Sequence, residues 1–438
     1  MARHQRLVAG RSPRRLAAPT AALCLALALL VACASSQAQT RLPRPTAPQD
    51  APNPKAQVDT HLSVVSRILS RMTLDQELGQ LFIVEYLYPD ANHSDLQAMI
   101  GQMGAGGVIL YESMNIYGVD QMRQLTQAME HTARIPLILG ADEEGGGDDQ
   151  TDKIFGPHPT ALQIGQTGDP RVAAQNAARI ASELKQLGMN ADFAPVVDVM
   201  GPDVAWTRSF SHSPAVVSQM GAAQVDAMQS AGVMACLKHF PGLGNTTVNP
   251  HHGLPVINSS RSYIEQNDLA PYRALMSHQP AMIMTTDLLM PALDPTMLAE
   301  LSYPIVTGVL RNEIGYNGVV VTDALYMAGI TDKYSMPEAG VLSIEAGNDM
   351  IEGPWNTDQM RAMIDALRSA VTSGRISKAR IDQSVRRILL LKQRFGMLPS
   401  GPPPGIQNMG SAGVVQGAPG GASALLASDA LAPDPAQA

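Results

Sequence analysis

Short apolar runs alternate with amphipathic stretches over most of the chain, a pattern typical of βα units on a parallel sheet. The apolar runs predict eight strands, at residues 81–85, 107–110, 137–141, 193–199, 233–237, 281–285, 319–322 and 349–351. The amphipathic stretches predict helices at residues 118–132, 171–187, 214–231, 260–277 and 304–313, and then at 358–372 and 377–394. Eight such strands can close an α/β fold of the (β/α)8 barrel type, with a single catalytic domain. No GxGxxG follows the first strand to favour a dinucleotide-binding fold.

Both ends of the chain lack this alternation. Arginines crowd the first fifteen residues, and an uncharged run rich in Ala and Leu follows them, which predicts a signal peptide over residues 1–33. The run ends Leu30-Val31-Ala32-Cys33, which resembles a lipobox with Cys33 as the acylated residue; a plain secretory cleavage near residues 36–38 is the alternative. Residues 34–57 are interpreted as a Pro/Gln/Ala-rich tether and residues 399–438 as a disordered tail, which leaves residues 58–398 for the barrel.

Charge and cysteine content narrow the possible partners. The chain has a formal net charge of −8, and loss of the five signal-peptide arginines would make it −13, so the sequence has no electrostatic footprint for nucleic acid. Apart from Cys24 in the signal peptide and Cys33, only Cys236 remains, and we expect it to be a small filler of the core. Because of the predicted signal peptide, we expect the protein to be exported, either to the cell surface or periplasm or into the medium. We expect it to contact a membrane only through a lipid at Cys33.

Polar side chains follow the predicted strands, where the carboxyl-terminal face of a barrel carries its chemistry. Each alone is open to interpretation as a helix cap or a solubilising residue, but their shared placement favours an active site. In chain order these residues are Asp142, Glu143, Glu144, Asp198, Arg208, Lys238, His239, Asp287 and Asp323.

The stretch KHFPGLGNTTVNPHHGLP, residues 238–255, draws most of this chemistry together. It starts with two cationic residues at a strand end, and it continues as a loop that contains His251 and His252. Four groups able to donate or shuttle protons near neutral pH thus lie within a short segment. A surface turn with incidental histidines is the alternative interpretation.

Several motifs in this order are similar to those of glycoside hydrolase family 3, and in particular to its bacterial single-domain β-N-acetylglucosaminidases. The resemblance covers about residues 65–397 and rests on MTLDQELGQLFIV, GGVILY, ADEEGG, APVVDV, RSF, KHFPGLG, VVVTDALYMAGI, AGNDMI and RIDQSVRRILLLKQRFG. It implies a (β/α)8 barrel and retaining hydrolysis through a covalent glycosyl-enzyme, without a cofactor or a metal ion.

The resemblance also implies roles for individual residues. Asp323 takes the place of the nucleophile, and a helix-capping role is its alternative. His251 takes the place of the acid/base, although the residues leave His252 open as the proton carrier. Substrate-binding positions are occupied by Asp142, Arg208, Lys238 and His239. Lys238 could equally be the partner of a barrel carboxylate, and the two roles are compatible.

Two departures from the family pattern affect the expected activity. Asn249 stands where an Asp orients the acid/base histidine, and Leu243 and Asn245 replace a His and an Asp of the same loop. An Asn offers the imidazole no charge, and the same exchange in a serine protease lowers turnover by roughly 10⁴-fold. Residues 147–150, which read GDDQ, replace a stretch that holds two arginines in the family, so substrate contacts differ there and an anionic substrate is disfavoured.

The sequence thus predicts hydrolysis of a terminal β-linked sugar, of the N-acetylglucosamine type, in peptidoglycan fragments or other amino-sugar glycans. A catalytically silent barrel that binds glycans is the alternative, favoured by Asn249 and the missing arginines. A metal site of His239, His251 and His252 is a weaker alternative, because the spacing matches no zinc motif and the acidic run 142–152 does not fit an EF-hand. A two-domain glucosidase is disfavoured because no second folded domain is predicted after residue 398.

Overall fold

The computed structural model describes residues 64–248 and 253–399. The predicted signal peptide, the tether and almost all of the predicted tail lie outside the described residues, and so do Asn249, His251 and His252. No helix in the described part of the chain is both long enough and apolar enough to span a bilayer.

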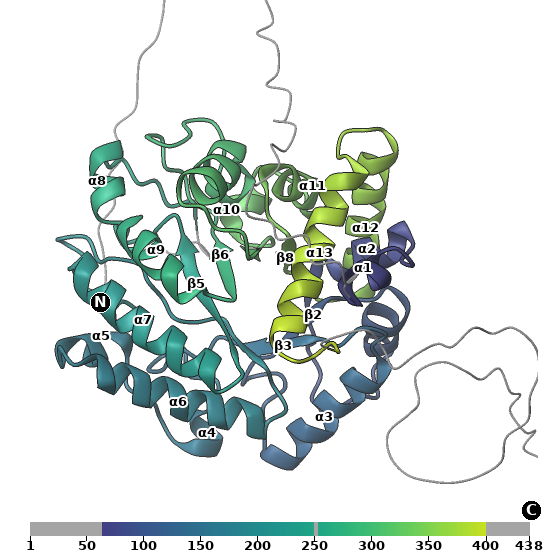
Figure 1. The fold of residues 1–438 in the computed structure, drawn as a ribbon, viewed down its shortest axis with the longest axis horizontal. Coiled ribbons are helices and arrows are strands. Elements are labelled where there is room, and N and C mark those ends of the chain that lie inside the picture. Colours follow the sequence, from purple (N-terminus) through teal and green to yellow (C-terminus); the bar gives the residue numbers. More distant parts are fainter. Residues whose placement is uncertain (1–63, 249–252, 400–438) are drawn as a thin grey trace, which may run out of the picture. The chain divides into compact units, whose positions relative to one another are not determined.

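Eight parallel strands form a closed barrel in which each strand pairs with the next along the chain and β8 pairs with β1 (Figure 1). The predicted (β/α)8 fold is therefore confirmed. The strands are β1 (Phe82–Glu85), β2 (Gly107–Ile109), β3 (Ile138–Ala141), β4 (Ala191–Asp192), β5 (Met234–Phe240), β6 (Met282–Thr285), β7 (Val319–Ala324) and β8 (Met350–Glu352).

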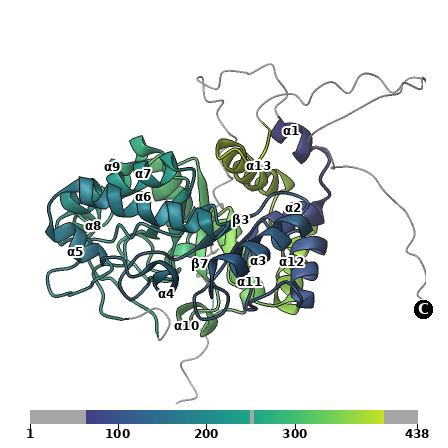
Figure 2. The same ribbon diagram turned by 90° about the horizontal axis from the view of Figure 1, so that it is seen from below.

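Helices surround the barrel, with α6 and α7 side by side on one flank and α2, α11 and α12 on another (Figures 1 and 2). The α-helices are α1 (Val64–Leu69), α2 (Leu74–Gln80), α3 (Val119–Thr132), α4 (Asp152–Phe155), α5 (Ala161–Gln166), α6 (Pro170–Gln186), α7 (Pro214–Ser230), α8 (Arg261–Gln266), α9 (Ala270–Leu275), α10 (Ala328–Thr331), α11 (Met336–Ala346), α12 (Thr357–Thr372) and α13 (Lys378–Arg394). The other helices in the described residues are the π-helices η1 (Leu96–Gln102) and η4 (Pro304–Glu313) and the 3₁₀-helices η2 (Met276–His278) and η3 (Ala299–Leu301).

Local sequence explains where several helices begin. Thr73 caps α2 in a capping box, because its hydroxyl accepts the Gln76 backbone N–H while the Gln76 side chain accepts that of Thr73. Asp169 caps α6, and Pro170 occupies the first helical position, where its missing N–H costs no hydrogen bond.

Two predicted strands have different bounds. The fourth strand was expected at 193–199 but is Ala191–Asp192, because Pro195 has no N–H for the sheet and interrupts the ladder. The apolar run nevertheless continues beside β5, and the Val197 N–H donates to the Lys238 carbonyl at 2.8 Å. The strand expected at 233–237 is also longer and ends at Phe240, so Lys238 and His239 lie within β5 rather than after it.

The helices differ more than the strands do. The predicted helix 260–277 is divided into α8, α9 and η2, with Pro271 in the first turn of α9. Several short helices were not predicted, among them α1, α2, α5, α10 and α11. Their sequences are too short or too uniformly apolar to show a clear helical period.

The core lies inside the barrel and between the barrel and its helices. Parallel strands covered on both faces consist largely of Val, Ile, Leu and Met, and β1, β3, β5 and β6 are buried along their whole length. Cys236 in β5 is buried with a free thiol, as expected of a small core residue.

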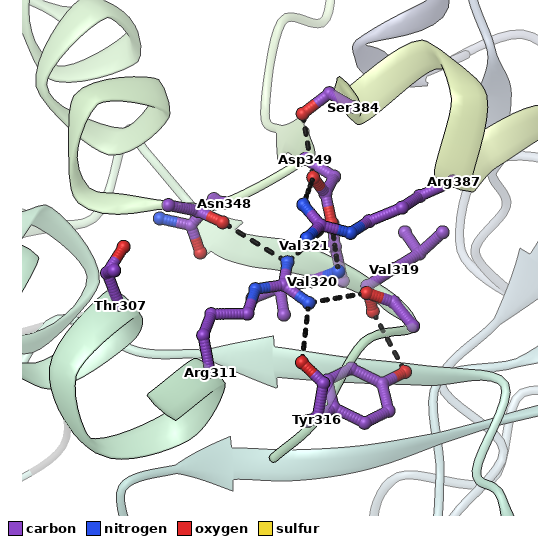
Figure 3. A network of polar contacts seen from close by, with 12 residues as sticks. Thr307, Arg311, Tyr316, Val319, Val320, Val321, Asn348, Asp349, Ser384 and Arg387 are labelled. Carbon is purple, nitrogen blue, oxygen red and sulfur yellow. Dashed lines mark hydrogen bonds and ion pairs between the residues drawn. The ribbon is translucent and has the colours of Figure 1, made fainter. Parts of the chain in front are cut away.

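An ionic cluster lies at the amino end of β8 (Figure 3). Asp349, which is fully buried, pairs with Arg311 of η4 and with Arg387 of α13 at 3.1 Å. It also accepts the Ser384 hydroxyl at 2.7 Å and the Val320 N–H at 3.1 Å. One carboxylate thus joins two strands to η4 and α13 at the end remote from the predicted active site.

Candidate active site

A cavity of about 530 Å³ opens at the carboxyl ends of the strands. Side chains at the carboxyl ends of β2, β5, β7 and β8, or in the loops that follow β2, β3, β4, β5 and β7, line it, as expected for a barrel whose chemistry lies on this face. Five residues identified in the sequence lie together in its lining, namely Asp142, Arg208, Lys238, His239 and Asp323. The sixth, His251, lies outside the described residues, so its role stays a prediction.

Lys238 lies at the centre of a chain of alternating charges. Its ammonium group, only 2% exposed, pairs with Asp142 Oδ1 and lies 2.7 Å from Glu144 Oε1. Arg208 donates two hydrogen bonds of 2.6 Å to the same Glu144, and its Nε lies 3.1 Å from Asp148 Oδ2. Acids and bases therefore alternate in the order Asp142, Lys238, Glu144, Arg208 and Asp148, and we call these five side chains the rim network. Their pairing holds each of them in place.

Pairing in the rim network sets the charge of its inner members. Burial alone would raise the pKa of Glu144, but the charges of Lys238 and Arg208 outweigh it and hold that pKa well below its ordinary value. Burial works against the charged form of Lys238, yet Asp142 and Glu144 outweigh it and raise the pKa of the ammonium group. Burial and then the charge of Glu144 raise the pKa of Asp148. Glu144 and Lys238 are therefore ionised at neutral pH.

His239 is oriented by a buried carboxylate. Its Nδ1 lies 2.7 Å from Oδ2 of Asp198. The other oxygen of Asp198, Oδ1, accepts the backbone N–H groups of His239 at 3.2 Å and Leu243 at 2.7 Å. The other ring nitrogen, Nε2, lies 3.4 Å from a guanidinium nitrogen of Arg208, and Trp206 stacks nearby. Asp198 thus fixes both the imidazole and the start of the loop after β5.

Asp323 lies near the end of β7 and turns a half-buried carboxylate into the cavity. Thr286 Oγ1 donates to its Oδ2 at 3.0 Å, and the Ala324 N–H donates to its Oδ1 at 2.9 Å. Its own N–H donates to Glu300 Oε2 at 3.2 Å. The carboxylate is held in one orientation while it remains accessible to a molecule in the cavity.

Two fully buried carboxyl groups neighbour Asp323. Asp287 follows β6 and Glu300 belongs to η3. Burial, and then the charge of Asp323, raises the pKa of Asp287 to about 8. Burial, followed by Asp287 and Asp323, raises the pKa of Glu300 well above its ordinary value. With a pKa of about 8, Asp287 is mainly uncharged at neutral pH and adds little negative charge beside Asp323.

Another carboxyl pair comes from the ends of β1 and β8. Glu352 lines the cavity, and Glu85 accepts a hydrogen bond of 3.2 Å from the hydroxyl of Tyr111, which also lines it. Burial raises the pKa of Glu85, and burial together with the charge of Glu85 raises the pKa of Glu352. This pair therefore holds protons more readily than an exposed carboxyl group does, whereas the pKa of Glu144 is lowered.

Sequence reasoning missed several of these residues. Glu352 directly follows the predicted eighth strand, so the strand-end pattern that identified Asp323 could have identified it too. Thr286 likewise directly follows the predicted sixth strand, one position before Asp287, so the same pattern could have identified it. Nothing in the local sequence marks Trp206 or Tyr326 as cavity residues, because both belong to irregular segments.

A cavity with this lining suits a small ligand rich in hydroxyl groups. Paired cations and carboxylates on a rigid rim each offer donors or acceptors, and Trp206 and Tyr326 offer aromatic faces. Asp323, which lines the same cavity, can attack an electrophilic carbon or stabilise a positive charge that develops beside it.

Comparison with known proteins identifies relatives of the whole barrel. Residues 73–391 match the model of the glycosyl hydrolase family 3 N terminal domain. Beta-hexosaminidase A of Pseudoalteromonas piscicida is 33% identical over 370 residues, which cover 74% of this chain but 62% of that protein. Beta-hexosaminidase LpqI of Mycobacterium tuberculosis is 30% identical over 388 residues, which cover 85% of this chain and 96% of that protein.

A solved structure has the same architecture. The glycoside hydrolase family 3 beta-N-acetylglucosaminidase from Paenibacillus sp. str. FPU-7 superposes with a TM-score of 0.70 at 36% identity, over 74% of this chain and 63% of that one. The chain thus spans less than two thirds of the length of some relatives and nearly all of others.

Proposed function

The chain belongs to glycosyl hydrolase family 3, and on this basis we propose that it is a retaining glycosidase that removes a terminal β-linked sugar of the N-acetylglucosamine type. The observation that carries the proposal is the position of Asp323, an accessible carboxylate oriented by Thr286 in the same cavity as the rim network. The names of the beta-hexosaminidase and beta-N-acetylglucosaminidase relatives support this class of sugar.

The proposed reaction has two steps. In the first, an oxygen of Asp323 forms a bond to the anomeric carbon while the glycosidic bond breaks, and an acid protonates the departing oxygen. In the second, a water molecule gives up a proton to the same group and attacks the anomeric carbon, which releases the sugar and restores the Asp323 carboxylate. His251 is the proposed proton carrier on the ground of its sequence position alone.

The rim network is proposed to bind the sugar hydroxyls. Lys238, Arg208 and His239 supply donors, and Asp142 supplies acceptors, with geometry that is fixed before the substrate arrives. The described cavity lining holds five carboxyl groups and only two Lys or Arg side chains. This balance favours a neutral glycan over one that carries a carboxylate near the scissile bond.

Export is also part of the proposal. The Arg-rich start of the chain, its apolar run and Cys33 support a signal peptide and a lipid anchor, and plain secretion is the alternative. A relative from Arthroderma benhamiae, 30% identical over 325 residues, is named a secreted glycosyl hydrolase.

Trapping of the covalent intermediate tests the proposed chemistry. The protein is incubated with 5-fluoro-N-acetylglucosaminyl fluoride, in which fluorine slows both steps while the good leaving group preserves the first, and its intact mass is measured. We expect one sugar adduct per chain, located on Asp323 by peptide mapping. Asp323→Asn should form no adduct and should hydrolyse a p-nitrophenyl N-acetylglucosaminide at least about 10³-fold more slowly, because the amide cannot form the ester.

Asp332→Asn, a change after α10 at a residue that does not line the cavity, is the matched control and should behave as the unaltered protein. An adduct that forms equally in Asp323→Asn would disprove the role of Asp323. If no adduct or turnover appears with any glycosyl fluoride while chitooligosaccharides still bind, the silent glycan-binding barrel is correct instead.

A further inference from the structure

A buried cluster of four carboxyl groups and one histidine lies outside the lining of the active-site cavity. Glu143, Asp149 and His158 form its centre, and Asp192 and Glu183 flank them; each of the five is at most 8% exposed. Glu143 and Asp149 belong to the loop after β3, Asp192 ends β4, and Glu183 lies on α6. Glu144, the next residue after Glu143, lines the cavity instead.

The central side chains come from the loop after β3 and from the segment between α4 and α5. His158 Nδ1 lies 3.1 Å from Asp149 Oδ2 and 3.5 Å from Glu143 Oε1, and one ligand atom from each residue lies within 4.8 Å of the others. Ligands bound at about 2.0–2.1 Å lie about 3.3 Å apart around a tetrahedral ion and about 2.9 Å apart around an octahedral one. The measured nitrogen to oxygen distances therefore already suit a shared metal ion.

The cluster holds more carboxyl groups than basic side chains that could pair with them. Within the described residues, Arg179 pairs with Glu183, but no Lys or Arg pairs with Glu143, Asp149 or Asp192. Glu143 Oε1 and Asp192 Oδ2 are buried and have no hydrogen-bond partner there. Glu143 keeps its other oxygen occupied by the Gln150 N–H at 2.8 Å, which leaves Oε1 turned to the histidine.

His158 is placed as a metal ligand needs to be. Its second ring nitrogen, Nε2, lies 2.9 Å from Glu183 Oε2, so a carboxylate lies beside this nitrogen, although the two atoms are not aligned for a hydrogen bond in the metal-free arrangement. A ligating histidine usually has such a carboxylate at its other nitrogen, which fixes the tautomer and leaves the first nitrogen free for the ion. Asp149 also accepts the His158 backbone N–H at 2.7 Å, which ties the two candidate ligands together.

From this geometry we propose that Glu143, Asp149 and His158 bind one divalent transition-metal ion of the Zn²⁺ or Mn²⁺ class, with water completing its coordination. Two carboxylate oxygens and one imidazole nitrogen form a mixed ligand set that such ions accept and that Ca²⁺ and Mg²⁺ favour less. The ion takes no part in the reaction proposed above. It fixes the loop after β3, whose Glu144 and Asp148 hold Arg208 in the rim network.

A shared proton is the competing arrangement. Burial and the neighbouring Asp149 carboxyl group raise the pKa of Glu143 to about 10 in the absence of an ion, and a neutral Glu143 could then donate a proton to a hydrogen bond with Asp149. The two arrangements differ in whether metal is bound and in whether metal stabilises the fold, and both properties can be measured without any assay of activity.

Metal content and thermal stability test the site. The full chain is prepared without a histidine tag, stripped with EDTA, freed of chelator and titrated with ZnCl₂ or MnCl₂. We expect one ion per chain by plasma mass spectrometry, and a melting temperature higher by about 5 °C when free metal exceeds the dissociation constant a hundredfold. CaCl₂ at the same concentration should give a smaller shift.

Three variants locate the site. Glu183→Gln should weaken metal binding roughly 10- to 100-fold through the orientation of the imidazole, and His158→Gln should weaken it further. His278→Gln is the matched control, because His278 forms an exposed pair with Asp226 at 2.9 Å, and it should bind metal as the unaltered chain does. The proposal is overturned if the unaltered chain binds no ion and gains no stability, or if His158→Gln and Glu183→Gln bind metal undiminished. Should His158→Gln not fold, stoichiometry in the unaltered chain and the Glu183→Gln affinity decide the question.

Discussion

Thr286 is the side chain through which the fold acts most directly on the proposed nucleophile. Its hydroxyl donates to Asp323 Oδ2 at 3.0 Å from the neighbouring strand end, while Thr285, one position earlier, donates to Asn348 at 2.9 Å. Successive residues of a strand face opposite ways, so two adjacent threonines serve different purposes here. One orients a reacting group and the other satisfies a buried amide.

Replacement of Thr286 by Val should therefore impair chemistry more than folding. A hydrogen bond to a charged group contributes about 1.5–3 kcal/mol, so we expect kcat to fall roughly 10- to 100-fold with little change in KM. Thr285→Val is the matched control and should lower the melting temperature while kcat stays near that of the unaltered chain. Equal losses of kcat in both variants would show that Thr286 acts through packing only. Steady-state kinetics and thermal denaturation of both proteins supply the comparison.

At this scale the sequence could predict the site in part. The strand-end pattern and the family motifs identified Asp142, Arg208, Lys238, His239 and Asp323, and the structure places all five in one cavity. The partners of each residue could not be predicted, because a pairing depends on distances between strands that are far apart in the chain. Lys238 illustrates this limit, since only the fold shows that it is already paired with two carboxylates.

Among the elements, β8 and α13 depend most on a single side chain. Asp349 is fully buried at the start of β8 and accepts bonds from Arg311, Arg387 and Ser384 (Figure 3). Burial would raise the pKa of Asp349, but the charges of Arg311 and then Arg387 outweigh it and lower that pKa. Loss of the carboxylate would leave buried guanidinium groups without a counter-charge.

Asp349→Ala should thus lower the free energy of unfolding by about 3–5 kcal/mol, the usual result when one partner of a buried ion pair is removed. Denaturant titration followed by circular dichroism measures the change. Asp358→Ala, which removes an exposed partner of Arg361, should change stability by less than about 0.5 kcal/mol. A loss for Asp349→Ala as small as that of the control would contradict the central role of Asp349.

Element boundaries show where sequence patterns stop being informative. Seven of the predicted strands overlap the observed ones, because a buried parallel strand is a short apolar run bounded by polar residues. The fourth failed because Pro195 interrupts the ladder inside an apolar run that otherwise reads as a strand. Helices such as α11 were missed because their sequence is apolar on nearly every side.

Over the whole molecule, buried acids without counter-charges should make stability depend on pH. Asp268 is 1% exposed, its two oxygens have no hydrogen-bond partner among the described residues, and burial with the charge of Asp198 raises its pKa to about 8. The folded protein thus retains a proton that the unfolded chain, with an ordinary pKa of 3.8, releases. The stabilisation of the fold by this retained proton is fully present below pH 4 and is lost as the pH rises through 8. Asp287, whose pKa is also raised, makes stability depend on pH in the same direction.

Asp268→Asn should reduce this dependence, because the amide is neutral at every pH. The free energy of unfolding of the unaltered chain should fall by up to about 1.4 kcal/mol per pH unit for this group between pH 4 and 8, and the variant should fall less steeply. At pH 8.5 we expect the variant to be the more stable protein. Denaturant titrations from pH 5 to 9 test this, and identical slopes for the two proteins would refute it.

The alternating order of the rim network also restricts how the protein can diverge. Loss of Lys238 alone leaves Asp142 without its cation, and loss of Arg208 alone does the same to Asp148, whereas loss of Arg208 together with Asp148 leaves no member unpaired. The effects of substitutions at Lys238 and Arg208 are therefore expected to depend on which acids remain beside them. Directed evolution of a new specificity at this rim should therefore sample a cation and its terminal acid together.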